Sequence, residues 1–288
     1  MAYIDKITRC NVRDLTKYTP LLVEGIHVGW LTNSRAEVIL GHPKVFIKTP
    51  LGVAMAPSLS TVDARTKALI KITPQLEDSG LFHKSTGEMY AIRNLWGGPT
   101  LLRMDRMLVP AFGARAYGVH VNGIVMKAGA THLWIGMRSS DRIVEPDKLD
   151  NIVAGGQPAS LSIMDNIIKE AYEEAGLEES LARSAKSASS ISYCFETPNG
   201  LRNDTLFCYD LHVPSGVVPC NMDGEISRFE LMPLHDVLAM VRDTDRFKFN
   251  VNLVIIDFAM RVGQLAPDNT PDYEQIALGL RNHPQPIV

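Results

Sequence analysis

A glycine-bounded segment near the middle of the chain constrains the fold more than any other feature. Gly155 and Gly156 precede a predicted helix, and Gly176 ends it. Three glutamates occupy positions i, i+3 and i+4 of that helix, namely Glu170, Glu173 and Glu174. Residues at this spacing emerge from one face, where like charges repel unless a cation lies in front of them. Because Mg²⁺ prefers such hard oxygen ligands together with substrate phosphates, the segment predicts a metal-dependent site for a diphosphate.

The bulk properties of the chain favour an ordinary globular protein. Its 288 residues suit two domains, and a hydrophobic content of 45% is enough for two cores. A formal net charge of −3 offers no basic field for nucleic acid. The first residues lack a signal-peptide pattern, and apolar runs such as 251–259 are too short to cross a membrane. We therefore expect a cytoplasmic protein that binds neither nucleic acid nor membrane.

The four cysteines show no close spacing of the kind found between zinc ligands. We expect buried free thiols at all four positions, which are Cys10, Cys194, Cys208 and Cys220.

The chain divides into three expected regions. Residues 1–112 predict a small α+β domain, residues 113–265 a second domain that contains the glycine-bounded segment, and residues 266–288 a partly helical, loosely attached tail. In the first region we expect a hairpin around Gly25, helices over 33–40, 60–77 and 100–108, and strands over 45–47, 53–55 and 88–93. In the second we expect strands over 117–126, 131–138, 190–197, 205–211 and 225–233, and helices over 162–175, 179–185, 235–242 and 252–262.

Residues 155–177 resemble the signature box of the Nudix hydrolases, which reads G-x5-E-x7-R-E-U-x-E-E-x-G-U, where U is aliphatic. Seven of its nine fixed positions match, at Gly155, Glu170, Ala171, Glu173, Glu174, Gly176 and Leu177. The basic position carries Lys169, and the first Glu of the box is replaced by Leu161, so these two residues cannot form the family's ion pair. The resemblance implies a Nudix α/β/α sandwich with a mixed sheet, preceded here by the small α+β domain.

The resemblance also implies a metal site. Mg²⁺ is the expected cofactor, with Mn²⁺ as a substitute, and Glu173 and Glu174 are the first choices as ligands. Glu170 would share a second ion or polarise the attacking water, and the backbone carbonyl of Gly155 would complete the shell. Glu225 lies where many family members keep a further metal-binding or basic carboxylate, with Glu230 as the competing candidate.

Several residues outside the three glutamates are candidates for contacts with the substrate. Lys169, Arg138 and Arg142 could each hold a phosphate, although exposed arginines are common at strand ends. His120 could line a substrate cleft or be a hydrogen-bonded core histidine. Trp96 beside Gly97-Gly98 could form a wall for a cationic ring, although a core position is the commoner role for such a tryptophan.

The remaining segments narrow the resemblance to one branch of the family. Residues 117–123, 133–139, 148–151 and 154–159 are similar to the Nudix part fused to some fungal thiamine pyrophosphokinases and to stand-alone relatives. This implies hydrolysis of thiamine diphosphate, or of its oxidised analogues, to the monophosphate. The alternatives are a nucleoside diphosphate linked to another group, such as ADP-ribose or a dinucleotide, and a Nudix binding module that has lost catalysis. The N-terminal domain would provide specificity or a homodimer interface.

Overall fold

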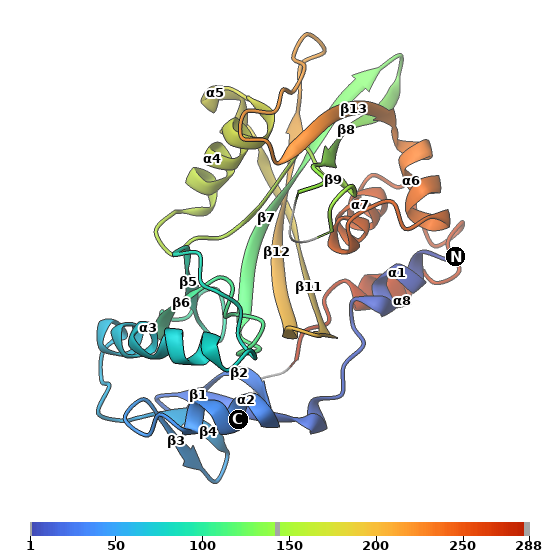
Figure 1. Ribbon diagram of the computed structural model, residues 1–288. Coiled ribbons are helices and arrows are strands. Elements are labelled where there is room, and N and C mark those ends of the chain that lie inside the picture. Colours follow the sequence, from blue (N-terminus) through green and yellow to red (C-terminus); the bar gives the residue numbers. More distant parts are fainter. Residues whose placement is uncertain (1, 142–144, 285–288) are drawn as a thin grey trace.

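The computed structural model describes residues 2–141 and 145–284. Its dominant feature is a mixed seven-stranded sheet with helices on both faces (Figure 1). The strands run in the order β11-β12-β7-β8-β13, while β10 pairs with β7 and β9 with β8. The strands are β7 (Arg115–Lys127), β8 (Ala130–Arg138), β9 (Leu149–Asp150), β10 (Val153–Gly156), β11 (Lys186–Thr197), β12 (Gly200–His212) and β13 (Ile226–Pro233). Only the pairing of β7 with β12 is parallel among these strands, and the mixed α+β fold is confirmed.

The alternating side chains of β7 separate the two faces of this sheet. Val119 and Val121 pack with residues of α4 (Ile163–Ala175) in one apolar cluster. Ile124 belongs to a second cluster on the opposite face, which contains α6 (Leu234–Asp243) and α7 (Phe249–Arg261). Because strand side chains alternate between faces, the sheet is covered by α4 on one side and by α6 and α7 on the other.

Helix α4 has the boundaries that the sequence predicts. The hydroxyl of Ser162 caps its first turn by accepting a hydrogen bond from the backbone N–H of Asp165, at 3.1 Å. Gly176 ends the helix in the left-handed conformation, with φ of 61°. The short helix α5 (Glu179–Ala182) follows. The glutamates at positions 170, 173 and 174 are therefore held on a helix whose two ends are both stabilised.

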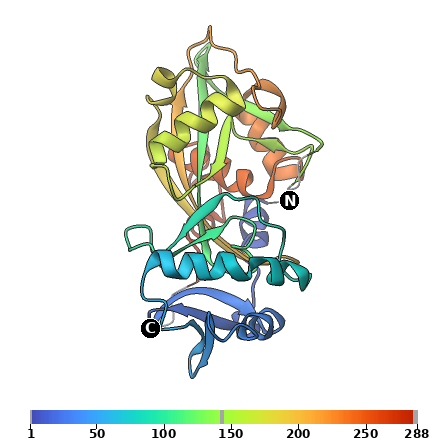
Figure 2. The same cartoon turned by 60° about the vertical axis from the view of Figure 1, so that its left-hand side comes forward.

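The N-terminal region has its own sheets and core. A four-stranded sheet has the order β2-β1-β4-β3, and β5 and β6 form a separate hairpin. Its elements are η1 (Leu15–Lys17), β1 (Tyr18–Val23), β2 (Ile26–Thr32), α2 (Asn33–Leu40), β3 (Phe46–Thr49), β4 (Gly52–Met55), α3 (Val62–Asp78), β5 (Met89–Ile92) and β6 (Leu102–Asp105). Helix α3 lies between the four-stranded sheet and the β5–β6 hairpin in Figure 2.

The predicted helix over 100–108 is wrong, because residues 102–105 form strand β6. This strand pairs with β5, with Leu102 opposite Ile92 and Asp105 opposite Met89. Leu102 and Met104 are buried whereas Arg103 between them is exposed, which is the two-residue period of a strand. Pairing with a distant segment therefore decides the structure of these residues.

Both ends of the described chain pack against the second domain. Helix α1 (Tyr3–Arg9) contacts α6, α7 and α8 (Tyr273–Gly279), and Figure 1 shows α1 beside α8. Ile7 is 1% exposed and lies in the same cluster as Ile276 and Leu280. The backbone N–H of Ser192 on β11 donates to the carbonyl of Leu280 at 2.9 Å. The predicted loose attachment of the C-terminal segment is therefore wrong for its described residues.

Backbone hydrogen bonds tie the N-terminal region to the large sheet. The N–H of Trp30 on β2 donates to the carbonyl of Phe112 at 3.0 Å, and that of Leu201 on β12 donates to the carbonyl of Pro110 at 3.0 Å. Gly113 has φ of 56°, and a Cβ at this position would lie 2.2 Å from the carbonyl oxygen of Trp30. The segment that enters β7 is thus held close to both units, and this places the β5–β6 hairpin against the large sheet.

Shortening Ile7 tests the docking of α1. We expect Ile7→Ala to lower the free energy of unfolding by about 2–5 kcal/mol, because it leaves a cavity in a fully buried cluster. Urea unfolding followed by circular dichroism measures this. Val12→Ala, at a side chain that is 62% exposed, is the matched control and should change the midpoint little. Equal effects of the two substitutions would contradict the docking of α1.

Candidate active site

The carboxylates of α4 meet strand β10 at the centre of the candidate site. Glu174 is 3% exposed. Its Oε2 accepts a hydrogen bond from the backbone N–H of Ala154, at 2.8 Å. A Cβ added to Gly155 would lie 2.5 Å from the carboxyl carbon of Glu170. The glycine therefore allows the carboxylate to lie directly on the strand backbone.

Strand β10 holds this position because it pairs with β7, with Gly155 opposite Val119 and Gly156 opposite Gly118. The side-chain amide of Asn166 on α4 donates to the carbonyl of Gly156 at 2.8 Å. Gln157 closes the loop before the helix, because its Nε2 donates to the carbonyl of Leu161 at 2.8 Å. Helix, loop and strand are thus joined by hydrogen bonds on either side of the carboxylates.

Asn166 and Gln157 are two site residues that the sequence analysis did not single out. Asn166 is completely buried and Gln157 is 5% exposed. One sequence feature could have identified Asn166 as a site residue. It is a polar side chain next to Ile167, which lies on the apolar side of α4. Buried amides of this kind are retained where they hydrogen-bond the backbone.

Burial and mutual repulsion disturb the ionisation of the carboxylates. Burial raises the pKa of Glu170 to about 7, against the opposing charge and hydrogen bond of Lys169. Burial also raises the pKa of Glu174 well above its usual range, and the charges of Glu170 and Asp150 add to this shift. Glu225 lies close enough to raise the pKa of both glutamates further. The site is therefore short of positive charge, which is a common property of catalytic clusters.

Lys169 is the cation nearest to these groups. Its Nζ lies 2.6 Å from Oε2 of Glu173 and 3.2 Å from Oε1 of Glu170. Burial opposes the shift, but the hydrogen bond with Glu173 and the charge of Glu170 raise the pKa of Lys169. Leu161 cannot form an ion pair with Lys169. The lysine instead pairs with two glutamates on its own helix, Glu170 and Glu173.

The donor set has the chemistry of a site for a hard divalent cation, although its side chains are not gathered around one point. No group of three or more His, Cys, Asp or Glu side chains within residues 2–141 and 145–284 is arranged to hold a metal ion. Glu170 and Glu174 nevertheless provide carboxylate oxygens whose repulsion a cation would relieve. Glu173, with a side chain 41% exposed, is turned towards Lys169.

The β5–β6 hairpin closes the site from the N-terminal region. A Cβ added to Gly156 would lie 1.6 Å from the hydroxyl oxygen of Tyr90. The backbone N–H of Ala159 donates to the carbonyl of Met89 at 2.8 Å. Arg106 forms an ion pair with Glu88 at 2.5 Å. The negative charge of Glu225 also helps to raise the pKa of Arg106. The loop before α4 is therefore shaped by residues from outside the Nudix-like segment.

Of the two arginines that were predicted to bind phosphate, only Arg138 lies within the described residues. Arg138 is 6% exposed, and its Nη1 lies 3.1 Å from Oδ2 of Asp150. Lys248 also pairs with Asp150, at 3.2 Å. Arg138 is thus part of a buried ion pair beside β9 rather than of the carboxylate cluster, and Arg142 lies outside the described residues. Glu230, the competitor of Glu225, is exposed on β13.

His120 lies in the interior on the α7 side of the sheet. It is 3% exposed, its Nδ1 lies 2.8 Å from Oδ1 of Asn151, and its Nε2 lies 3.4 Å from Nδ2 of Asn250. Burial lowers its pKa to about 4. Of the two predicted roles, these contacts match the hydrogen-bonded core histidine.

Trp96, the candidate wall for a cationic ring, is a partly exposed aromatic residue. It is 38% exposed and packs edge-on against Tyr117 and Phe207, which stack on each other. The guanidinium carbon of Arg93 lies 5.2 Å from the centre of the tryptophan ring. The face of Trp96 therefore already accepts a cation.

Comparison with known proteins identifies the family. A family model described as a domain of unknown function (DUF4743) matches residues 2–116. The chain is 34% identical to Nudix hydrolase 24, chloroplastic, of Arabidopsis thaliana, over 97% of this chain and 78% of the relative. It is 33% identical to Nudix hydrolase 20, chloroplastic, of the same plant, over the same shares. The chain belongs to the Nudix hydrolase family. It is an enzyme of the pyrophosphohydrolase type.

Two further similarities of this Nudix hydrolase are weaker. The uncharacterised protein YJR142W of Saccharomyces cerevisiae is 31% identical, over 60% of this chain and 54% of the relative. Among solved structures, the NUDIX domain of Shewanella oneidensis NrtR in complex with ADP ribose is 15% identical, with a TM-score of 0.41, over 53% of this chain and 91% of that one. A structural likeness of this size carries no argument about substrate.

The contact between Tyr90 and Gly156 in this Nudix hydrolase can be tested by a double-mutant cycle. We expect Gly156→Ala to lower the free energy of unfolding by about 1–3 kcal/mol, because the new methyl group overlaps the tyrosine side chain. Tyr90→Ala removes that overlap, so the glycine substitution should cost less in the Tyr90→Ala background. Urea unfolding of the four proteins measures the coupling. Additive effects would contradict the contact.

The buried His120 predicts a particular dependence of stability on pH. Its folded pKa of about 4 lies below the unfolded value of 6.5. The unfolded state therefore binds the proton first, and stability that is present above pH 6.5 is lost as the pH falls towards 4, by at most roughly 3 kcal/mol. His120→Gln should flatten the unfolding free energy over this interval, whereas His132→Asn, on the partly exposed part of β8, should not. An unchanged slope in His120→Gln would contradict this assignment.

Proposed function

We propose that this Nudix hydrolase cleaves the diphosphate linkage of thiamine diphosphate, or of its oxidised analogues, to release the monophosphate. The observation that carries the hydrolytic part is the buried pair Glu170 and Glu174, held against β10 with raised pKa values. The thiamine part is supported by the resemblance of four segments to one branch of the family. Trp96 is a partly exposed aromatic side chain, but Arg93 lies over its ring and would have to move before a cationic ring could stack there.

The proposed metal ligands are Glu170, Glu173 and Glu174, with the carbonyl of Gly155. When bound, Mg²⁺, or Mn²⁺ in its place, neutralises the diphosphate oxygens and acidifies a water molecule. Glu174 is fixed for this task by its hydrogen bond from Ala154. Glu170 is proposed to share a second ion or to polarise the attacking water, and Glu225 is the proposed further carboxylate that binds metal or acts as a base.

Lys169 is the proposed contact with the substrate phosphate. Its side chain is 42% exposed and at present pairs with Glu170 and Glu173. If those carboxylates held a metal ion, Lys169 would be free to contact a phosphate oxygen. Arg138 and His120 are proposed to support the site through the buried pairs that they form, and Arg142 stays a predicted phosphate contact.

We propose that the N-terminal region determines specificity, because Tyr90, Met89 and Arg106 reach the loop before α4 or the neighbourhood of Glu225. A homodimer stays a prediction that size-exclusion chromatography with light scattering tests.

The cellular location also stays a prediction. No helix in the described part of the chain is long and apolar enough to cross a membrane. The two plant relatives are named as chloroplastic. Our proposal for this chain is cytoplasmic, and fluorescence microscopy of the tagged protein in its own organism tests it.

A substrate panel tests the proposed specificity. The compounds are thiamine diphosphate, its oxidised analogues, ADP-ribose and a dinucleotide, each with Mg²⁺, and the readout is release of the phosphate monoester. We expect selective turnover of the thiamine compounds. Turnover of the nucleotides alone would replace the thiamine proposal with a nucleoside-diphosphate substrate. No turnover of any compound, with metal bound, would favour a binding module.

Glu174→Gln tests the role of charge at the metal site. The amide keeps a hydrogen-bond acceptor for Ala154 and loses the negative charge, so we expect kcat to fall by at least about 100-fold while the unfolding midpoint is preserved. The exposed Glu178→Gln is the matched control and should retain activity. Full activity of Glu174→Gln on a substrate of the panel would remove Glu174 from the proposed ligand set.

A further inference from the structure

A second polar pocket lies at the junction of the N-terminal region and the large sheet, away from the carboxylates of α4. It is lined by residues of β2, of the loop after β5, of β7 and of β12, namely His27, Val28, Gly29, Trp30, Arg93, Asn94, Arg115, Asn203 and Pro284. Arg115 lies four residues before Val119, the partner of Gly155, which corresponds to about 13 Å along the strand. The pocket therefore does not belong to the proposed catalytic site.

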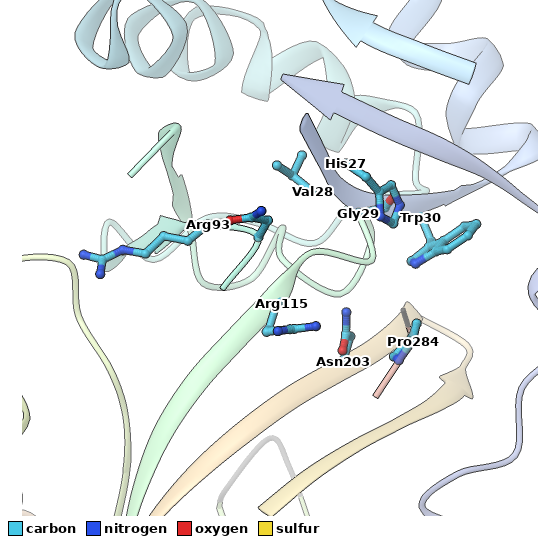
Figure 3. A pocket seen from close by; sticks show the side chains of 9 residues that line it. His27, Val28, Gly29, Trp30, Arg93, Arg115, Asn203 and Pro284 are labelled. Carbon is cyan, nitrogen blue, oxygen red and sulfur yellow. The ribbon is translucent and has the colours of Figure 1, made fainter. Parts of the chain in front are cut away.

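The inner end of this pocket holds polar atoms without partners. Arg115 is 7% exposed and Asn203 is 6% exposed. Nε of Arg115 and Oδ1 of Asn203 have no hydrogen-bond partner within the described residues. The two residues are neighbours in the parallel register of β7 and β12. Figure 3 shows that their side chains point towards each other from these strands.

The charges around the pocket are one-sided. Among the described residues, no carboxylate lines the pocket and none forms an ion pair with Arg115. Arg93 also lines it, although Figure 3 shows its guanidinium turned away. His27 contributes no positive charge near neutrality, because burial lowers its pKa. A buried guanidinium that lacks a counter-charge is costly, so the site favours an anion over a water molecule.

We propose that this pocket binds a small oxyanion of the phosphate type, bridged between Arg115 and Asn203. One oxygen accepts from Nε of Arg115, and a protonated oxygen donates to Oδ1 of Asn203. The inner space is about 20 Å³, and the empty volume including the open mouth is about 270 Å³. A phosphate group would therefore extend from the inner space into the mouth, and a buried nucleotide or ring would not fit. The source is either free inorganic phosphate or the phosphate of an ester whose remainder stays at the mouth.

A bound anion would also connect the two parts of the molecule. His27, Gly29 and Trp30 belong to β2 of the N-terminal sheet, while Arg115 and Asn203 belong to the large sheet. Binding to the folded form alone stabilises a protein in proportion to ligand concentration. Phosphate should therefore strengthen the junction without any turnover.

Thermal unfolding without catalysis tests this proposal. The full chain is titrated with inorganic phosphate, and separately with thiamine monophosphate, in EDTA and at constant ionic strength maintained with chloride. EDTA removes metal-bridged binding at the carboxylates, so failure here leaves the proposed function untouched. We expect a saturable rise in Tm. A rise with phosphate identifies the free ion as sufficient, and a rise with the ester alone identifies the ester as the source.

Three variants decide whether the rise in Tm comes from phosphate bound in this pocket. Arg115→Met should weaken the effect at least about tenfold, as expected for a lost charge-assisted hydrogen bond. Asn203→Asp provides a carboxylate opposite Arg115, so it should raise Tm in buffer alone and abolish the response to phosphate, even if Arg115→Met fails to fold. Arg103→Met, at an exposed arginine paired with Asp63, should respond like the natural protein. An absent response in the natural protein, or an unchanged response in Asn203→Asp, would overturn the proposal.

Discussion

The close approach of α4 to β10 is the constraint on which the rest of the site depends. Gly155 leaves room for the carboxyl group of Glu170 on one side of the strand, and Gly156 leaves room for the Tyr90 hydroxyl. A side chain at either position would separate the helix, the strand and the N-terminal hairpin. The hydrogen bonds of Glu174 and Asn166 to this strand then set the orientation of the helix. Missing Cβ atoms are thus as important to the site as the carboxylates.

The sequence was informative where local chemistry decides the structure. The limits of α4 follow from the Ser162 cap and the left-handed Gly176, both of which act within a few residues. Strands β7 and β8 follow from their length and from the turn between them. Strand β6 and helix α1 were not predicted, because their structure depends on partners far away in sequence. Leu102 requires Ile92, and Ile7 requires a cluster built from the last helices.

The same distinction explains what could be predicted of the site. The three glutamates share a face by helix geometry alone, so their grouping needed no tertiary information. Whether a polar residue on β7 or β8 reaches that face depends on which side of the sheet each helix covers. His120 lies on the α7 side, and Arg138 turns to Asp150. The contribution of Tyr90 comes from a separate hairpin, and no pattern around position 156 indicated it.

The docking of α1 beside α8 has a consequence for the order of folding during synthesis. Residues 3–9 leave the ribosome long before residues 273–280, which are among their neighbours in the core. The N-terminal sheets and α3 have a core of their own and can assemble while the rest of the chain is being made. Helix α1 cannot complete its contacts until α8 has been made, so part of its apolar side stays exposed while the residues between them are synthesised.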